Sequence, residues 1–405
     1  MRSVQARTPL HPSSFAPAVE HIAREPDCTG SIFKIPCIMS SNPYTVRLSC
    51  PTGVNNHGMT LRSERLWSET PSNVLFIVDP QNDFSDASYR RQAGSLPVQG
   101  ATADYARIID FLKNNDIQEV HVSLDTHSPR HIAHPGFWDI WNGECWEHAT
   151  EANSIFRRLS IDVQGRIAGT SANDTWYFQP RRYGCSDLEY AALLNYVREY
   201  ISFFYLPANL HLQKPTIWPY HCIEGQAGHR VAAELQEFLD RWVGGGEHTG
   251  PATKQRILRY HNKGRNNLSE MYSAFSADKP VTPTDFRLLQ KFAYDGPGTP
   301  TLRHDSTGHK HYANHSTNVD TKLNVDLIEH LLRNHNHVYF CGEARTHCVK
   351  ATLLDVMRVV EAKPALYNPE NVELLHNMSS PIIAPDTPDD IAAIMFQNGF
   401  SVSEQ

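Results

Sequence analysis

The chain has 405 residues, of which 40% are hydrophobic and 20% are charged, as in ordinary globular proteins. Its net charge of −7 argues against nucleic acid as the main partner. No apolar stretch approaches the roughly 20 residues that a membrane-spanning helix needs, so we expect no membrane partner.

The first 70 residues differ in composition from the rest. Residues 1–70 are rich in Pro, Ser, Thr and Asn with little periodicity, so we expect a partly disordered extension. The segment carries Arg2 and Arg7 and has no acid before Glu20, which leaves an organelle transit peptide as the alternative. The eight cysteines include no CxxC pair, a pattern that suits a reducing compartment. We therefore expect a cytoplasmic protein, with organelle targeting as the other hypothesis.

Strands and helices alternate from residue 73 onward. Apolar runs predict strands at 73–79, 119–125, 255–264 and 337–342. Helical periodicity predicts helices over 102–116, 187–205, 229–242, 324–336, 346–360 and 387–399. Such alternation indicates a parallel sheet with helices on both faces. We therefore predict an α/β fold for residues 71–405, a three-layer α/β/α sandwich with a mainly parallel sheet.

Two stretches interrupt this alternation, at about 139–214 and 278–320. Loops of this length are usually functional or disordered. We interpret both stretches as insertions that enlarge the domain and form a lid, an oligomer interface or a subdomain. A homo-oligomer is one of the outcomes that the sequence leaves open.

Polar residues stand at the carboxyl ends of the predicted strands, where the ligand crevice of a parallel sheet lies. Asp79 and Asp125 end two strands and Lys263 ends a third. Cys348 follows the strand at 337–342 and opens a helix, whose dipole is expected to lower the thiol pKa. Because a carboxylate can accept a thiol proton and a lysine can stabilise a thiolate, these residues suggest a cysteine nucleophile with its activating groups. Taken singly, each has an ordinary alternative as a turn, cap or core residue.

A second group of residues suits a metal ion. The run DTH at 125–127 places the carboxylate of Asp125 and the imidazole of His127 on one side of an extended segment. WPYHC at 218–222 presents His221 after a Trp-Pro turn. One carboxylate and two imidazoles with open positions can bind zinc, iron or manganese together with a water or a substrate atom. In a chain with 22 histidines, a polar turn is the alternative for DTH.

Five motifs occur in the order found in isochorismatase-like cysteine hydrolases. They are IVDPQNDF (77–84), DTHSPRHIAHPGFW (125–138), WPYHCIEGQAG (218–228), KGRNNLSEMYSAF (263–275) and CGEARTHCVKAT (341–352). Within that family the chain most resembles nicotinamidases. The resemblance implies a catalytic triad of Asp79, Lys263 and Cys348. It also implies one divalent metal ion on Asp125, His127 and His221, with zinc favoured over iron or manganese.

The resemblance extends to the substrate pocket. It implies an oxyanion hole made by the backbone N–H groups of Ala344 and Cys348, with a cis peptide bond between Glu343 and Ala344. By the same resemblance, Phe84 and Trp218 correspond to aromatic residues that sandwich a pyridine ring, and His347 fits the family's loop. Cys341 is then a thiol of the core.

The chain departs from the family's pattern at several positions. Glu343, Arg345 and Thr346 replace the residues usual in the nucleophile loop, which suggests a different pocket rim. Many relatives carry a further metal-shell residue where this chain has Ala133, and either His131 or His134 is the candidate replacement. The segment at 304–315 carries four histidines, for which we favour a flexible loop over a second metal site.

Three functions follow from these patterns. The leading hypothesis is a metal-assisted cysteine amidohydrolase that converts nicotinamide to nicotinate and ammonia through a thioester, a step of NAD salvage. The second is a related amidase that acts on a ureido, carbamoyl or other amide substrate. The third is a non-catalytic scaffold protein, against which the intact Asp79, Lys263 and Cys348 argue.

Overall fold

The computed structural model describes residues 72–86, 93–171, 174–244, 256–302, 317–382 and 388–403. The expected extension at 1–70 and the histidine-rich segment at 304–315 lie outside these described residues. The chain divides at Arg65, and the fold described below is that of the second unit, Leu66–Gln405. Among the described residues, no helix combines the length and the apolar character that a membrane crossing requires.

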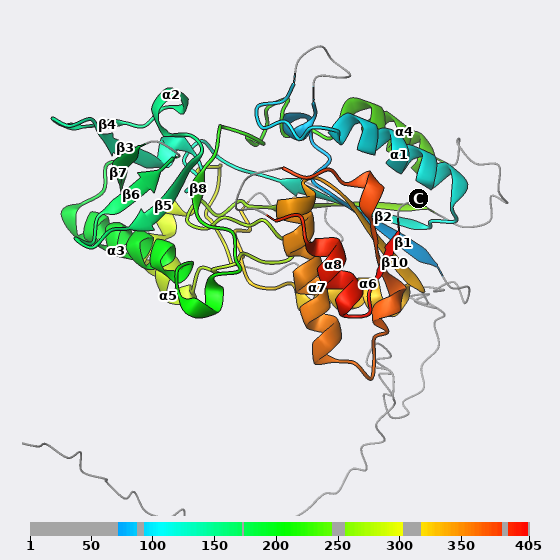
Figure 1. The fold of residues 1–405 in the computed structure, drawn as a ribbon. Coiled ribbons are helices and arrows are strands. Elements are labelled where there is room, and N and C mark those ends of the chain that lie inside the picture. Colours follow the sequence, from blue (N-terminus) through cyan, green and yellow to red (C-terminus); the bar gives the residue numbers. More distant parts are fainter. Residues whose placement is uncertain are drawn as a thin grey trace, which may run out of the picture. The chain divides into compact units, whose positions relative to one another are not determined.

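A six-stranded parallel sheet forms the centre of the second unit, as the sequence predicts (Figure 1). Its strands lie in the order β12-β11-β10-β1-β2-β9, and every neighbouring pair is parallel. The strands are β1 (Asn73–Val78), β2 (Glu119–Asp125), β9 (Ile257–Lys263), β10 (His337–Gly342), β11 (Val372–Leu375) and β12 (Ser401–Ser403). The sequence missed β11 and β12 because runs of four and three residues are too short to show a period.

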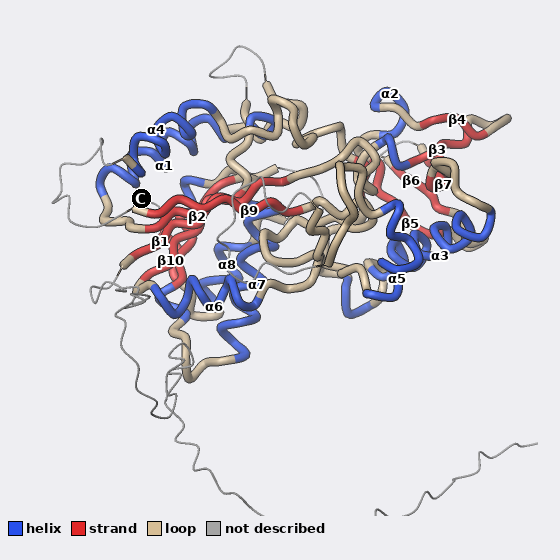
Figure 2. The backbone as a smooth tube through the Cα atoms, turned by 180° about the vertical axis from the view of Figure 1, so that it is seen from behind, coloured by secondary structure: helices blue, strands red, loops and turns tan. Residues whose placement is uncertain are grey.

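Helices cover both faces of this sheet, which confirms the predicted three-layer sandwich. One face carries α1 (Ala101–Asn114) and α4 (Ala233–Val243). The other carries α6 (Val325–Asn334), α7 (Lys350–Ala362) and α8 (Ile391–Gln397), as Figures 1 and 2 show. Because side chains alternate along a strand, Leu75 of β1 packs under α1 and α4 while Phe76 packs under α6 and α7.

A second sheet of six strands occupies most of the first stretch that interrupts the alternation. Its neighbouring strands are all antiparallel, in the order β4-β3-β7-β6-β5-β8. Its elements are β3 (Trp138–Trp141), β4 (Trp146–His148), α2 (Glu151–Ser154), β5 (Arg157–Ile161), β6 (Ile167–Thr170), β7 (Thr175–Pro180) and β8 (Thr216–Ile217). With α3 (Asp187–Phe203) and α5 (Pro283–Leu289), the sheet encloses a core of its own around Trp138, Phe178 and Tyr200.

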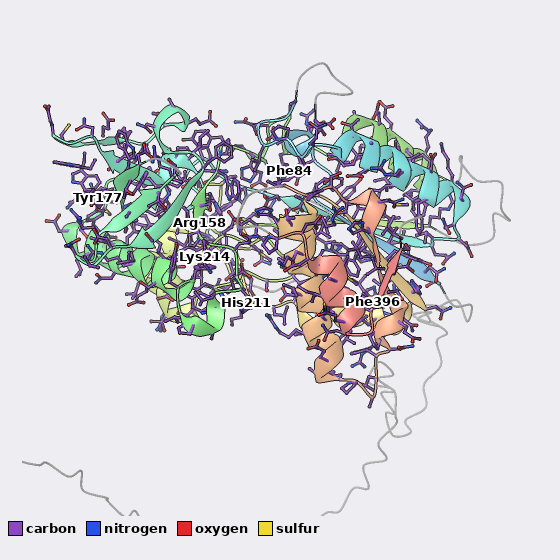
Figure 3. The ribbon with its side chains drawn as sticks, in the orientation of Figure 1. Phe84, Arg158, Tyr177, His211, Lys214 and Phe396 are labelled. Atoms are coloured by element: carbon purple, nitrogen blue, oxygen red, sulfur yellow. The ribbon has the colours of Figure 1, made fainter. Side chains whose placement is uncertain are left out.

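The segments that enter and leave the second sheet carry several of the predicted site residues. The stretch 126–137 joins β2 to β3, and Trp218 and His221 follow β8 directly. Just before β8, the segment with His211 and Lys214 lies between the second sheet and α7 (Figure 3). Gln213 from this segment donates from Nε2 to the carbonyl of Thr346 at 3.1 Å. The segment that leads into β8 therefore contacts the turn that contains Cys348.

Loss of a core phenylalanine tests this packing. Phe340 of β10 is fully buried, with its ring centroid 5.6 Å from that of Phe76. Phe340→Ala is expected to lower the free energy of unfolding by about 3–5 kcal/mol, because it removes apolar contacts and leaves a cavity. Phe396 of α8, 78% exposed and labelled in Figure 3, is the control. Phe396→Ala is expected to change stability by only about 0.5 kcal/mol. Equal losses in urea unfolding of the two variants would contradict the assignment of the core.

Candidate active site

Four predicted functional residues meet at the carboxyl end of the parallel sheet. Asp79 follows the last residue of β1 and adopts a left-handed φ of 45°. Asp125 and Lys263 end the neighbouring strands β2 and β9 and are direct partners in the sheet register. Cys348 lies in the turn Arg345–Val349 between β10 and α7. The sheet order therefore brings together residues that stand far apart in the sequence.

Lys263 contacts the other three residues of this group. Its Nζ lies 3.0 Å from Oδ2 of Asp79, 3.0 Å from Oδ1 of Asp125 and 3.5 Å from Sγ of Cys348. The ammonium also donates to the carbonyl of Met271 at 2.9 Å. All four side chains of the group are buried, so one cation lies between two carboxylates and a thiol.

The protonation states follow from burial and from these charges. Burial raises the pKa of the Cys348 thiol well above its ordinary value, although the charge of Lys263 opposes the rise. Burial also raises the pKa of Asp79, again against the effect of Lys263. For Lys263, burial alone would lower the pKa, but Asp125 and Asp79 outweigh it and raise the pKa well above its usual range. The group thus holds a protonated thiol beside a charged lysine.

The expected lowering of the Cys348 pKa by the start of a helix is wrong. Cys348 lies inside a π-helical turn and not at the first residue of α7, and its side chain is buried. Burial in apolar surroundings disfavours the thiolate more than the partial charge of a helix terminus favours it. A thiolate at this position therefore depends on a base that removes the proton, and Asp79 is a carboxylate near enough to help raise the pKa of the thiol.

The turn before Cys348 has a defined backbone. The peptide bond between Glu343 and Ala344 is cis. Gly342 precedes it with φ 109°, and a Cβ at this position would lie 2.1 Å from the carbonyl oxygen of Val78. A glycine is therefore required where β10 leaves the sheet. The N–H groups of Ala344 and Cys348 belong to this same turn. Their role in an oxyanion hole stays a prediction.

The three predicted metal ligands converge beside the lysine. Nε2 of His127 lies 3.0 Å from Oδ2 of Asp125, and Nε2 of His221 lies 3.4 Å from the same oxygen. Metal–ligand bonds of about 2.0–2.2 Å in a tetrahedron place ligand atoms roughly 3.3 Å apart, so these spacings fit one divalent ion. Both rings are held by their other nitrogen, since Nδ1 lies 3.1 Å from the carbonyl of Gly264 in one case and 2.8 Å from that of Pro219 in the other.

Gly264 forms part of the wall of this group. Its φ is 75°, and a Cβ there would lie 2.7 Å from Cε1 of His127 and 2.9 Å from Oδ1 of Asp125. The backbone can approach the two ligands closely only because the residue after Lys263 has no side chain.

His134 is placed as the candidate fourth ligand. One nitrogen each from His127, His134 and His221 lies within 4.8 Å of the others. Nε2 of His134 lies 3.2 Å from Nδ1 of His221, so its ring must shift toward Asp125 to join the same ion. His131 belongs instead to a group with His127 and Glu270. Ala133, at the position where relatives have a metal-shell residue, contributes its carbonyl to the N–H of Trp218 at 2.7 Å.

The aromatic residues named from the sequence lie around this centre. The ring of Phe84 is 5.7 Å from that of His221, and Figure 3 shows Phe84 on the side of the main sheet toward the second sheet. Trp218 meets His347 edge-on at 5.6 Å and donates from Nε1 to the hydroxyl of Tyr272 at 3.1 Å. Tyr272 lies in a motif that the sequence analysis quoted, but it was not singled out there.

Glu343 and Arg345, which depart from the usual nucleophile loop, are respectively buried and paired. Glu343 is fully buried, accepts a hydrogen bond from the N–H of Ser380 at 3.3 Å and lies against Asp104 of α1. Burial and the charge of Asp104 raise the pKa of Glu343 well above its usual range, so it is held as the neutral acid. Arg345 pairs with Asp389.

Sequence analysis missed two residues that position Asp79 and Asp125. Ser123 donates to Oδ1 of Asp79 at 2.7 Å, and its oxygen accepts from the N–H of Asp79 at 3.1 Å. The side chain of Gln81 bonds both the N–H and the carbonyl of Asp125, at 2.7 and 2.8 Å. Ser123 precedes Asp125 by two residues on one face of β2, and this spacing is the signal that could have identified it.

Comparison with protein-family models gives no match, and comparison with curated proteins gives none. Among solved structures, the chain is similar to a nicotinamidase/pyrazinamidase of Acinetobacter baumanii, with 16% identity over 82% of this chain and 96% of that one and a TM-score of 0.41. It is also similar to the yeast nicotinamidase Pnc1p bound to the inhibitor nicotinaldehyde, with 18% identity over 82% of this chain and all of that one (100%) and a TM-score of 0.41.

A third similar structure is the pyrazinamidase of Pyrococcus horikoshii in complex with zinc. The identity is 15%, over 83% of this chain and 100% of that one, with a TM-score of 0.36. The function proposed below rests on the geometry of the site and on the motifs of the sequence.

Removal of His134 tests the metal group. His134→Ala is expected to weaken zinc binding at least about tenfold, because it removes a ligand from the group with His127 and His221. His131→Ala is the matched control, a buried histidine on the same segment that is expected to leave the affinity within about threefold. Competition with a chromophoric chelator measures both. A larger loss in His131→Ala would place the ion in the group with Glu270.

Proposed function

We propose that the protein is a cysteine amidohydrolase that requires a divalent metal ion, and that its substrate is nicotinamide. The observation that carries this proposal is the position of the Lys263 ammonium, 3.0 Å from Asp79 and 3.5 Å from the sulfur of Cys348. Hydrolysis of an unactivated amide needs a nucleophile, a proton donor for the leaving amine and a place for negative charge. Cys348, Asp79 and the turn at 343–348 supply these in one buried group.

In the first half of the reaction, the sulfur of Cys348 attacks the amide carbon while Asp79 takes the thiol proton. The C–N bond breaks as Asp79 passes that proton to the nitrogen, and ammonia leaves. Lys263 keeps its charge throughout and stabilises the carboxylate and the developing thiolate. The N–H groups of Ala344 and Cys348 would hold the negative oxygen of the tetrahedral intermediate, an effect worth about 3 kcal/mol for each donor.

In the second half, water hydrolyses the thioester. Asp79 now acts as the base that takes a proton from water, and the carbon–sulfur bond breaks to release nicotinate and regenerate the thiol. Ser123 keeps Asp79 oriented for both steps through its hydrogen bond at 2.7 Å. Burial favours this role for Asp79, since it moves the pKa of the carboxyl upward toward the working range of a general base.

The metal group would be formed by Asp125, His127 and His221, with His134 as a fourth ligand. A divalent ion held there supplies a Lewis acid that can bind a ring nitrogen of the substrate. Phe84 and Trp218 supply apolar ring surfaces beside it. A small aromatic amide with a basic ring nitrogen matches this combination, and the resemblance of the five motifs to nicotinamidases also supports nicotinamide.

A related amidase with a larger substrate is the alternative. A cavity of about 290 Å³ lies between the segment just before β8 and α7, and Thr346 and His347 of the nucleophile turn form part of its lining. Cys348 and the metal group are not among the lining residues, so the cavity adjoins the turn and not the nucleophile itself. The changed residues of the nucleophile loop motivate this alternative, and ureido or carbamoyl compounds are its substrates.

Ammonia release from nicotinamide tests the proposal. Cys348→Ala is expected to lower kcat at least about 1,000-fold, because the nucleophile is lost. The matched control is Cys145→Ser, which changes an exposed cysteine and is expected to leave kcat unchanged. Removal of metal with a chelator is expected to abolish activity, and added zinc to restore it. Wild-type activity that persists in Cys348→Ala would overturn the nucleophile assignment.

A substrate panel separates nicotinamide from the alternative. The proposal expects kcat/KM for nicotinamide and pyrazinamide to exceed that for ureido and carbamoyl compounds by about 100-fold or more, since only the former offer a ring nitrogen to the metal. If ureido compounds alone are hydrolysed, and Cys348→Ala abolishes that activity, the amidohydrolase assignment stands and nicotinamide is wrong.

A further inference from the structure

A second buried cluster of ionisable side chains lies at the opposite end of β2 from Asp125. Glu119 opens this strand, and His121 follows two residues later on the same face. His330 belongs to α6, and His335 directly follows the last residue of that helix. The side chains of Glu119 and His121 are 8% and 0% exposed, so a carboxylate and an imidazole are held here away from water.

Three imidazole nitrogens converge on the Glu119 carboxylate. Nε2 of His121 lies 2.9 Å from Oε1, and Nε2 of His330 lies 3.9 Å from the same oxygen. Nε2 of His335 lies 3.1 Å from Oε2. One ligating atom each from Glu119, His121 and His330 lies within 4.8 Å of the others. Since ligand atoms around tetrahedral zinc are roughly 3.3 Å apart, one divalent ion fits between these groups.

The other nitrogen of each ring has a partner. Nδ1 of His121 lies 2.8 Å from Nε2 of His261, and Nδ1 of His335 lies 2.9 Å from the carbonyl of Leu331. Metal-binding histidines almost always donate from their second nitrogen to such an acceptor, which directs the first one at the ion. Nδ1 of His330 lies 2.8 Å from the donor nitrogen Nδ2 of Asn334, so binding through Nε2 requires that the Asn334 amide turn and accept from Nδ1 through its oxygen.

The arrangement of donors and acceptors in the cluster requires a positive charge beside the Glu119 carboxylate. Because Nδ1 of His335 donates to a carbonyl, a neutral His335 turns the lone pair of Nε2 toward the Glu119 carboxylate. Two lone pairs at 3.1 Å repel, so a proton or a metal ion must supply positive charge at the cluster. Arg259 donates from Nε to Oε1 at 2.5 Å. A carboxylate offers about four lone-pair positions, so Arg259 and an ion can share it.

We propose that Glu119, His121 and His330 bind a second divalent ion of the zinc class, distinct from the ion proposed at the active site. Imidazole and carboxylate ligands suit zinc, and the side chain of His330 is 18% exposed, so the cluster lies close to the surface. The bound ion joins α6 to β2 across one edge of the sandwich. It therefore stabilises the folded chain, because it binds the native state and not the unfolded one.

Zinc binding in a background without the active-site metal group tests this proposal. The variant His127→Ala/His221→Ala removes His127, which is shared by both other candidate groups among the described residues. The full-length background variant is stripped with a chelator, incubated with zinc and passed through gel filtration. It is then analysed for bound zinc and for the change in Tm on zinc addition, with circular dichroism to verify folding.

His330→Gln is then added to the background, with His337→Gln as the matched control. His337 is also a partly exposed histidine beside a glutamate, with Nε2 2.8 Å from Glu373, but it lies outside the proposed site. The expected result is about one zinc per chain in the background and in the control, and at least about tenfold weaker binding in His330→Gln. Zinc is expected to raise Tm in the first two proteins and not in the third.

Two results would overturn the proposal. The first is a folded background variant that binds no zinc and shows no rise in Tm. The second is zinc binding that His330→Gln leaves unchanged, which would place the ion elsewhere in the chain. In either case the Glu119 carboxylate is neutralised by protons and by Arg259 alone.

Discussion

A single buried cation organises the carboxyl end of the main sheet. The ammonium of Lys263 touches Asp79, Asp125 and Cys348 at once, and without it two carboxylates would be buried side by side with no counter-charge. The lysine therefore couples the group that would attack the substrate to the group that would hold the metal. Asp125 belongs to both groups, since its Oδ1 contacts Lys263 and its Oδ2 contacts His127. This shared carboxylate explains why nucleophile and metal lie next to each other.

The topology of the parallel sheet brings these residues together. Adjacent strands end at the same edge, and the register pairs Asp125 of β2 directly with Lys263 of β9. The glycines that follow two of these strands, Gly264 and Gly342, let the chain turn where any Cβ would collide with a ligand or with the neighbouring strand. Burial then sets the proton positions. It raises the pKa of the Cys348 thiol and of the Asp79 carboxyl, which in the proposed reaction makes Asp79 the group that takes the thiol proton.

The sequence predicted the strands and helices that form continuous apolar or periodic runs. The strands at 119–125 and 337–342 and the groups at their ends were found, because buried parallel strands are apolar throughout and their polar ends stand out. The short strands β11 and β12 and the whole second sheet were missed, since these runs are either very short or, unlike β1 and β10, not continuously apolar. The orienting role of Ser123 was missed for another reason. It depends on a cross-strand contact with Asp79 that exists only in the folded chain.

The central claim is that Cys348 forms a covalent thioester, with no direct attack by water on the amide. The partition of products between water and hydroxylamine tests it most directly. If nicotinamide and a nicotinate ester form the same acyl-enzyme, the ratio of hydroxamate to acid at a fixed hydroxylamine concentration must be identical for both, because the leaving group has already departed. The account predicts equal ratios. Ratios that differ with the leaving group would show that no common intermediate forms, and Cys348 would then not be the nucleophile.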